Sequence, residues 1–250
     1  MGLRTILKKK IYNLKYLKTK HNYIKEKLIL ITGASSGIGL ALTRELLKNN
    51  KVIAVYNSNS KNLEKISVSN LIKVKCDLSN FLDYEELTKT LVQYKIDIII
   101  NCAGQFGSSN QLIENIDFDN LIKIFKINSI SIVKILQLLS KNDGLKWITK
   151  IVNISSDAGS IKLNDQGNAY IYRITKSALN SISKNLSIDL NKRFNSEIIT
   201  VDPGNVKTGM NGKGLLDSNK CAEYIIDIIC DKKNNYNGKF INLLKKEISW

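Results

Sequence analysis

The 250-residue sequence is short of proline, histidine and arginine, and each shortage excludes a feature. Pro203 is the only proline, so no proline-rich linker divides the chain and one domain is expected. His21 is the only histidine and lies outside any predicted site. We therefore expect neither a histidine-based catalytic triad nor a metal site of the zinc type.

The sequence also lacks the apolar segments and cysteine patterns of membrane and secreted proteins. No apolar run approaches the roughly 20 residues that span a bilayer, and the N-terminus alternates lysine with apolar residues instead of forming a signal-peptide core. Cys76, Cys102, Cys221 and Cys230 show neither metal nor redox spacing. Reduced structural thiols in a cytoplasmic protein are expected.

Positive charge dominates, with a formal net charge of +16 at pH 7. Such a charge raises the question of nucleic acid binding. Only Arg4, Arg44, Arg173 and Arg193 are arginines, however, whereas base and phosphate readers favour arginine. Ile, Asn and Lys are abundant along the whole chain. We therefore expect no nucleic acid partner.

About half of the excess charge lies in residues 1–27, where nine basic side chains face one acid. Apolar residues recur there at near-helical spacing, with lysines between them. A basic amphipathic helix of this kind can lie on an anionic membrane surface. We favour instead a basic N-terminal extension that packs on the domain or on a neighbouring subunit.

From residue 28 onward, short apolar runs alternate with helical patterns. Strands are expected near 28–32, 51–56, 71–76, 96–101, 147–155, 196–202 and 238–242. Helices are expected near 38–49, 83–94, 117–140, 170–193 and 218–230. This alternation predicts an α/β fold, a single doubly wound domain in residues 28–250 with a seven-stranded parallel sheet. Ligands of such sheets bind at the carboxyl ends of the strands.

A glycine-rich turn at residues 32–39, Thr-Gly-Ala-Ser-Ser-Gly-Ile-Gly, joins the first strand to the first helix. Its glycines allow a sharp turn, the close approach of a diphosphate, and tight packing of the helix on the strand. The N–H groups at the start of the helix attract the anion. A purely structural turn is the alternative. The nucleotide contacts expected from this turn are Gly33, Ser35, Ser36, Gly37, Ile38 and Gly39.

The turn after the second strand favours NADP over NAD. An acid often bonds the ribose hydroxyls of NAD at this place, but residues 56–61 read Tyr-Asn-Ser-Asn-Ser-Lys. A 2′-phosphate would meet Asn57, Lys61 and the hydroxyls of the glycine turn instead of a repelling carboxylate. The same residues also suit an ordinary polar turn, and NAD stays possible.

Two further strand ends are expected beside the glycine turn. Asp77 and Leu78 follow the third strand, and Asp77 can accept a hydrogen bond from an adenine amino group. Asn101, Ala103 and Gly104 follow the fourth strand and form a ledge of small residues for a ribose. Each could also be an ordinary strand-end turn.

The fifth strand and the next helix carry the residues for chemistry. Ser156 ends the strand, and Tyr172 and Lys176 are four residues apart, so they share one helical face. A tyrosine has a pKa of about 10, which a neighbouring ammonium and a cationic nicotinamide bring towards the working range. Ser156 can donate a hydrogen bond to a substrate carbonyl. Tyr-x-x-x-Lys is informative only through its place after the Ser-Ser strand and the glycine turn.

Together these motifs resemble the short-chain dehydrogenase/reductase family over residues 28–250. The matching segments are Thr32 to Gly39, Asn101 to Gly104, Asn128, Ser156, Tyr172, Lys176 and Pro203 to Thr208. Cys102 stands where the family usually has a second asparagine.

The resemblance implies a Rossmann fold and a role for each matching residue. Tyr172 would donate the proton, and Lys176 would bind the nicotinamide ribose and tune Tyr172. Ser156 would orient the carbonyl, and Asn128 would hold a water of the proton relay. The segment from Pro203 through Gly204 to Val206 would line the nicotinamide pocket, and Thr208 would contact the cofactor amide or phosphates.

A closer resemblance is to the C-factor and Sniffer-type carbonyl reductases. Residues 155–164 and 170–180 carry their Gly-Ser-Ile, Tyr-x-Tyr-Arg and Lys-Ser-Ala-Leu-Asn, with the longer gap from serine to tyrosine found in that subgroup. Its members usually prefer NADPH. Ser36 and Asn57 stand where arginines are common.

We therefore expect an NADP-dependent oxidoreductase that reduces an aldehyde or ketone to an alcohol. The substrate would lie between Phe106, the 157–170 loop and the 205–217 segment, which can act as a lid. Epimerases and dehydratases that use the same residues need a larger C-terminal domain. A non-catalytic nucleotide-binding sensor or signalling protein is the alternative from another class. Homo-oligomers through the helices near 117–140 and 170–193 are common in the family that the sequence resembles, but its C-factor-like members include monomers as well as dimers, and the sequence does not choose between them.

Overall fold

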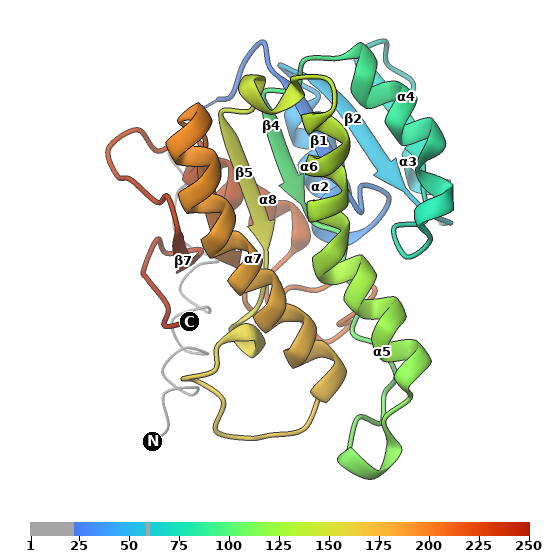
Figure 1. Ribbon diagram of the computed structural model, residues 1–250, viewed down its shortest axis with the longest axis vertical. Helices are drawn as coiled ribbons and strands as arrows, with labels where there is room; N and C mark the ends of the chain where they lie inside the picture. Colours follow the sequence, from blue (N-terminus) through green and yellow to red (C-terminus); the bar gives the residue numbers. More distant parts are fainter. Residues whose placement is uncertain (1–22, 59–60) are drawn as a thin grey trace.

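A computed structural model describes residues 23–58 and 61–250, and it is built on one parallel sheet (Figure 1). The seven strands lie in the order β3-β2-β1-β4-β5-β6-β7. Their bounds are β1 Leu28–Thr32, β2 Lys51–Tyr56, β3 Leu71–Lys75, β4 Ile98–Asn101, β5 Lys150–Ile154, β6 Glu197–Asp202 and β7 Lys239–Asn242. The order reverses next to β1, so the ends of β1 and β4 meet at the switch point of a doubly wound sheet.

Helices cover both faces of the sheet. Successive strand residues point to opposite faces, so Ile29 and Ile31 pack in one core cluster and Leu30 in the other. The first cluster joins the sheet to α2 and α8, and the second joins it to α4, α6 and α7. The helix bounds are α2 Gly37–Leu46, α3 Lys61–Glu64, α4 Glu85–Gln93, α5 Phe118–Phe125, α6 Ser131–Ser140, α7 Tyr170–Phe194 and α8 Ser218–Ile229.

The predicted α/β class and the seven-stranded parallel sheet are confirmed. Two details differ from the prediction. The short helix α3 follows β2, where only a turn was expected. A π-helical turn at Lys126–Ile130 separates α5 from α6, where the pattern predicted one continuous helix. In this turn the N–H of Ser131 donates to the carbonyl of Lys126, five residues back, and the Ser131 hydroxyl donates to the carbonyl of Ile127 at 2.8 Å.

No helix among the described residues is both long and apolar enough to cross a bilayer. The predicted basic extension falls outside the described residues except for its last five, Tyr23 to Lys27.

The loops that leave the carboxyl ends of the strands form one end of the molecule (Figure 1). The C-terminal tail supports one of them. The Ser160 hydroxyl donates to the carbonyl of Ser249 at 2.6 Å, and the Trp250 ring stacks on Phe240 with centroids 5.5 Å apart. The stretch between β5 and α7 is thereby tied to the end of the chain.

Candidate active site

The glycine turn lies directly against the end of β4. Gly33 has a φ of +68°, and a Cβ there would come within 2.8 Å of the Ala103 backbone. The Thr32 hydroxyl oxygen accepts hydrogen bonds from the N–H groups of Cys102 and Ala103, both at 3.2 Å. Thr32 and Gly33 thus contact the backbone of residues 102–103 so closely that position 33 has no room for a side chain.

The start of α2 has the form of an anion site. Ser36 precedes the helix in an extended conformation and its side chain makes no cap hydrogen bond, so it leaves the first N–H groups of α2 uncapped. Ser36 is exposed, whereas Ser35 is buried and Ile38 is partly buried. A Cβ on Gly39 would collide with the carbonyl of Gly33. These groups fit a diphosphate, which needs N–H donors and close backbone approach.

The loop after β6 closes over this turn. A Cβ on Gly37 would lie 3.1 Å from the methyl group of Thr208, so the two segments touch. Val206 is buried and pairs with Leu216, and Gly204 adopts a φ of +68°. The 205–217 segment, predicted as a lid, is folded back on itself by hydrogen bonds such as Lys207 N–H to the Leu216 carbonyl at 2.8 Å.

Asp77 and Asn57 meet at the ends of β3 and β2. The Asp77 carboxylate accepts hydrogen bonds from the backbone and hydroxyl of Ser79 and from the side chain of Asn57. Burial opposes ionisation, but these bonds and the charge of Lys123 lower the pKa of Asp77. The next residue, Leu78, is buried.

Asn101 turns its side chain into the sheet. Its Nδ2 donates to Asn153 Oδ1 at 2.7 Å, and Asn153 Nδ2 donates to the Ser183 hydroxyl at 2.8 Å. Among the described residues, Asn101 Oδ1 is buried without a hydrogen-bond partner. The side-chain amide of Asn101 therefore links β4 to β5 and, through Asn153, to α7.

Ser156, Tyr172 and Lys176 come together at the end of β5. The Lys176 ammonium donates to the Ile154 carbonyl at 2.8 Å and lies 5.7 Å from the centre of the Tyr172 ring. The hydroxyls of Ser156 and Tyr172 are hydrogen-bonded. Lys176 is buried at 4% exposure, while Tyr172 and Ser156 are partly exposed. Tyr172 and Lys176, four residues apart on α7, therefore lie next to Ser156, which follows the end of β5.

Close packing of a short helical turn holds Ser156 in this position. The Ser156 hydroxyl accepts a hydrogen bond from the N–H of Ala158 at 3.2 Å and so caps the turn Asp157–Gly159. A Cβ on Gly159 would lie 2.8 Å from the carbonyl of Lys176. The absence of a side chain at Gly159 lets the Ser156 segment lie against α7.

Asn128 lies in the π-helical turn and fastens the β4–α5 loop. Its side chain accepts a hydrogen bond from the N–H of Gln105 at 2.8 Å and donates to the Gln105 carbonyl and the Thr175 hydroxyl, each at 2.9 Å. A Cβ on Gly104 would contact both Lys176 Nζ and Asn128 Oδ1, at 3.5 and 3.6 Å. Asn128 thus borders the space beside Lys176.

Comparison with known proteins decides the family. The sequence model of the short chain dehydrogenase family matches residues 27–218. The chain belongs to the short chain dehydrogenase family. C-signal of Myxococcus xanthus is 25% identical over 156 residues, which cover 62% of this chain and 93% of C-signal.

Two solved structures extend this comparison. The carbonyl reductase Sniffer of D. melanogaster superimposes with a TM-score of 0.82 at 26% identity, covering 90% of this chain and 100% of Sniffer. An NADPH-bound carbonyl reductase from chicken fatty liver shares the fold, with a TM-score of 0.81, 24% identity, and coverage of 91% and 100%. The predicted resemblance to this oxidoreductase family, with Sniffer and C-factor-type relatives, is confirmed.

In this short chain dehydrogenase, the pKa of Lys176 and the pKa of Tyr172 shift in opposite directions. Burial lowers the pKa of Lys176 to about 8, against the opposing influence of Cys102 and Asp202. Burial raises the pKa of Tyr172 to about 12, the hydrogen bond with Ser156 opposes the rise, and Asp202 and Asp157 add to it. The expected fall of the tyrosine pKa is therefore not produced by the chain's own side chains, and the phenol is protonated at neutral pH.

Sequence reasoning missed two acids of this short chain dehydrogenase. Asp202 is buried at the end of β6, and Asp157 follows Ser156 directly and accepts a hydrogen bond from its hydroxyl at 3.2 Å. The one available sequence signal is that Asp202 immediately precedes the only proline. Gln111 was missed as well: its side-chain oxygen accepts a hydrogen bond from the N–H of Tyr172 at 3.2 Å, at the start of α7.

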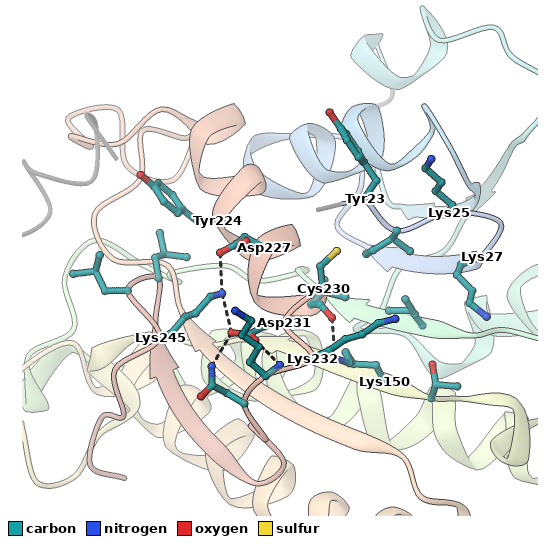
Figure 2. A pocket seen from close by; sticks show the side chains of 18 residues that line it. Tyr23, Lys25, Lys27, Lys150, Tyr224, Asp227, Cys230, Asp231, Lys232 and Lys245 are labelled. Carbon is teal, nitrogen blue, oxygen red and sulfur yellow. Dashed lines mark hydrogen bonds and ion pairs between the residues drawn. The ribbon is translucent and has the colours of Figure 1, made fainter. Parts of the chain in front are cut away.

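A separate cavity of about 1080 Å³ lies at the opposite, amino edge of the sheet. Six lysines line it together with Asp227 and Asp231, and Figure 2 shows the Lys245 ammonium between these two carboxylates. Lys27 and Lys150 pair with Asp97 and Glu197 at 2.8 Å each, so much of the positive charge is neutralised. The remaining lysines of the cavity are Lys25, Lys232 and Lys233.

Proposed function

We propose that this short chain dehydrogenase is an NADPH-dependent reductase that converts an aldehyde or ketone to an alcohol. One observation carries the proposal: Ser156, Tyr172 and Lys176 converge at the carboxyl edge of the sheet beside the glycine turn. The bound cofactor would supply the hydride that reaches the carbonyl carbon. Gly33, Gly37 and the first N–H groups of α2 would hold its diphosphate.

The protein's part in this reaction is to place and move a proton. Tyr172 would donate its phenolic proton to the carbonyl oxygen, and its pKa of about 12 keeps that proton in place until transfer. Ser156 would hold the same oxygen by a hydrogen bond and stabilise the developing charge. Lys176, fixed by the Ile154 carbonyl, would present its ammonium to the cofactor ribose and to Tyr172. A protonated tyrosine favours reduction over oxidation.

Several features favour NADPH. Tyr56, Asn57 and Ser58, which end β2 and begin the following turn, include no carboxylate, and Ser36 is exposed at the start of α2. Asp77, an acid close to Asn57, is engaged by Ser79 and by Asn57 itself. The similar chicken carbonyl reductase is bound to NADPH. A 2′-phosphate would therefore meet amides and hydroxyls.

The substrate would be largely apolar around its carbonyl group. The Phe106 ring packs against Tyr172, with centroids 5.1 Å apart, and is itself 38% exposed. The loops beyond the carboxyl edge also expose Leu112, Ile161 and Met210. Exposed apolar side chains beside a polar centre suit a hydrophobic molecule that carries one reducible group.

Removal of the Tyr172 hydroxyl tests the proposed chemistry. Purified protein with NADPH and a panel of apolar aldehydes and ketones is expected to consume NADPH. Tyr172→Phe should lower kcat by about 10²-fold or more while NADPH binding persists. Tyr170→Phe, two residues away on the same helix, is the matched control and should keep its activity. NADPH binding without any turnover across the panel would favour the non-catalytic sensor instead.

Titration of the protein with NADPH and with NADH tests the cofactor. Tighter binding of NADPH is expected, because no carboxylate at the end of β2 would repel the 2′-phosphate. Preference for NADH would overturn this part of the proposal, and binding of neither would overturn the whole of it.

A further inference from the structure

Asp202 is a buried acid that has no role in the proposed chemistry. It ends β6, directly before Pro203, and is 8% exposed. Its carboxylate accepts hydrogen bonds from the N–H of Gly204, at 2.9 Å, and from the N–H of Asp157. Lys176 is close enough to interact electrostatically, but its ammonium donates to the Ile154 carbonyl. The acid is thus held by backbone groups.

The two N–H groups belong to the two loops that border the candidate site. Asp157 follows Ser156, so a bond to its N–H fixes the segment that aims the serine hydroxyl. Gly204 begins the loop that reaches Gly37 through Thr208. The strands beneath are already paired, since Ser155 N–H donates to the Val201 carbonyl at 2.8 Å. One carboxylate therefore joins the serine side of the site to the cofactor side.

The charge of Asp202 acts on the whole cluster. It is faced by Asp157 from the turn after β5, by Tyr172 and Lys176 from α7, and by Cys221 from α8. Burial raises the pKa of Asp202 to about 7 and the Asp157 carboxylate adds to the rise, against the two N–H bonds and Lys176. The ionised acid in turn raises the pKa of both Tyr172 and Lys176.

We propose that Asp202 is a positioning residue of the active site, whose ionised carboxylate fastens the Ser156 loop to the Pro203–Gly204 loop and keeps Tyr172 in its proton-donating form. The proposal rests on the proposed carbonyl reduction. Loss of the proton from Asp202 strengthens both N–H bonds, because a carboxylate is a better acceptor than a carboxylic acid. Activity should then rise as the pH passes upward through the ionisation of Asp202.

Asp202→Asn tests the charge with little change of shape, since the amide oxygen can still accept from Gly204. In kcat/KM against pH, the wild type is expected to show an ascending limb near pH 7. The variant should lose this ascending limb. Its descending alkaline limb should move to lower pH, because Asp202 no longer raises the pKa of Tyr172 and Lys176. Its kcat should fall about tenfold, because Ser156 is misplaced. A profile that superimposes on the wild type would overturn the proposal.

Asp157→Asn is the matched control. It removes the neighbouring charge but keeps the backbone N–H that Asp202 binds. Because Asp157 raises the pKa of Asp202, this variant should keep the ascending limb and move it to lower pH. An unmoved limb would contradict the assignment to Asp202. The control also keeps the proposal testable if Asp202→Asn does not fold.

A readout independent of turnover separates this proposal from the proposed function. An acid whose pKa is raised in the folded state destabilises the fold as pH rises between its unfolded and folded pKa values. The Tm of Asp202→Asn relative to the wild type should therefore increase from pH 5 to pH 8, whether or not any substrate is found. A Tm difference that is constant over this range would overturn the proposal even in an active enzyme.

Discussion

Each edge of the parallel sheet has a lysine close to aspartate, but the two edges differ in how these side chains are hydrogen-bonded. At the amino edge, the Lys245 ammonium lies 2.9 Å from a carboxylate oxygen of each of Asp227 and Asp231 (Figure 2). At the carboxyl edge, Lys176 and Asp202 are buried near each other, but Lys176 donates to a backbone carbonyl and Asp202 accepts from backbone N–H groups. Lys176 and Asp202 are buried, whereas Lys245, Asp227 and Asp231 are partly exposed, so both the burial and the hydrogen-bond partners differ between the edges.

The pKa directions follow both differences. Burial opposes the charge of Lys245, but its two aspartates raise its pKa, and Asp231 has its pKa lowered by Lys245, Asn234 and Tyr236 despite burial. At the other edge burial prevails, so the pKa of Lys176 falls and that of Asp202 rises, to about 8 and about 7. A lysine and aspartates that pair directly stay charged at neutral pH and stabilise the fold. A lysine and an aspartate that are buried without direct pairing have pKa values near neutral pH, so their charges can change there.

Replacement of the carboxyl-edge lysine should give the largest effect. Lys176→Met is expected to lower kcat/KM by about 10²-fold or more, because Tyr172 loses its neighbouring ammonium and the cofactor ribose loses a donor. The free energy of unfolding should change by less than about 1 kcal/mol, because the gain from removing a buried charge offsets the lost hydrogen bond of the Ile154 carbonyl. Steady-state kinetics and urea unfolding measure both. A large loss of stability in Lys176→Met would show that the carboxyl-edge lysine also stabilises the fold, and the proposed difference between the two edges would be wrong.

Replacement of the amino-edge lysine should show the reverse pattern. Lys245→Met leaves Asp227 and Asp231 without their shared cation, so the free energy of unfolding should fall by about 1–3 kcal/mol, allowing for partial exposure of the pair. Turnover of the folded protein should be unchanged. If activity fell as much as in Lys176→Met, the two edges would not be functionally separate.

The smallest effect is a pH dependence at Asp231. Its folded-state pKa lies below the unfolded value of about 3.9, so the stability that its carboxylate contributes is present above about pH 4 and is lost as the pH falls through the folded-state value. Asp231→Asn should therefore destabilise the protein by about 1–2 kcal/mol at pH 7 and by less at pH 3. Urea midpoints at the two pH values give the comparison. An equal difference at both would show that the charge of Asp231 is not responsible.

Local patterns in the sequence were enough for most of the fold. Apolar runs such as residues 28–32 and 98–101 identify buried strands, and the spacing of Tyr172 and Lys176 identifies a helical face. Gly33 could be assigned to a tight turn because only glycine takes its conformation without strain. The roles of the candidate site residues stay predictions until they are tested.

The features that the sequence did not reveal depend on contacts between distant residues. Asp202 acquires its environment from the N–H of Asp157, which is 45 residues earlier in the chain. Nothing in either local sequence indicates that the two carboxylates will be neighbours. The π-helical turn was missed for a related reason: residues 117–140 carry a helical pattern throughout, and only the hydrogen bonding of the backbone marks the change.

That π-helical turn has a consequence for how related sequences are aligned. A π turn equals an α-helix with one residue inserted, so α5 and α6 are out of phase by one residue, or about 100° of rotation. A relative with an uninterrupted helix would need a one-residue gap within positions 126–130. A gap placed elsewhere would align Asn128 with the wrong residue and shift the apolar face of one of the two helices.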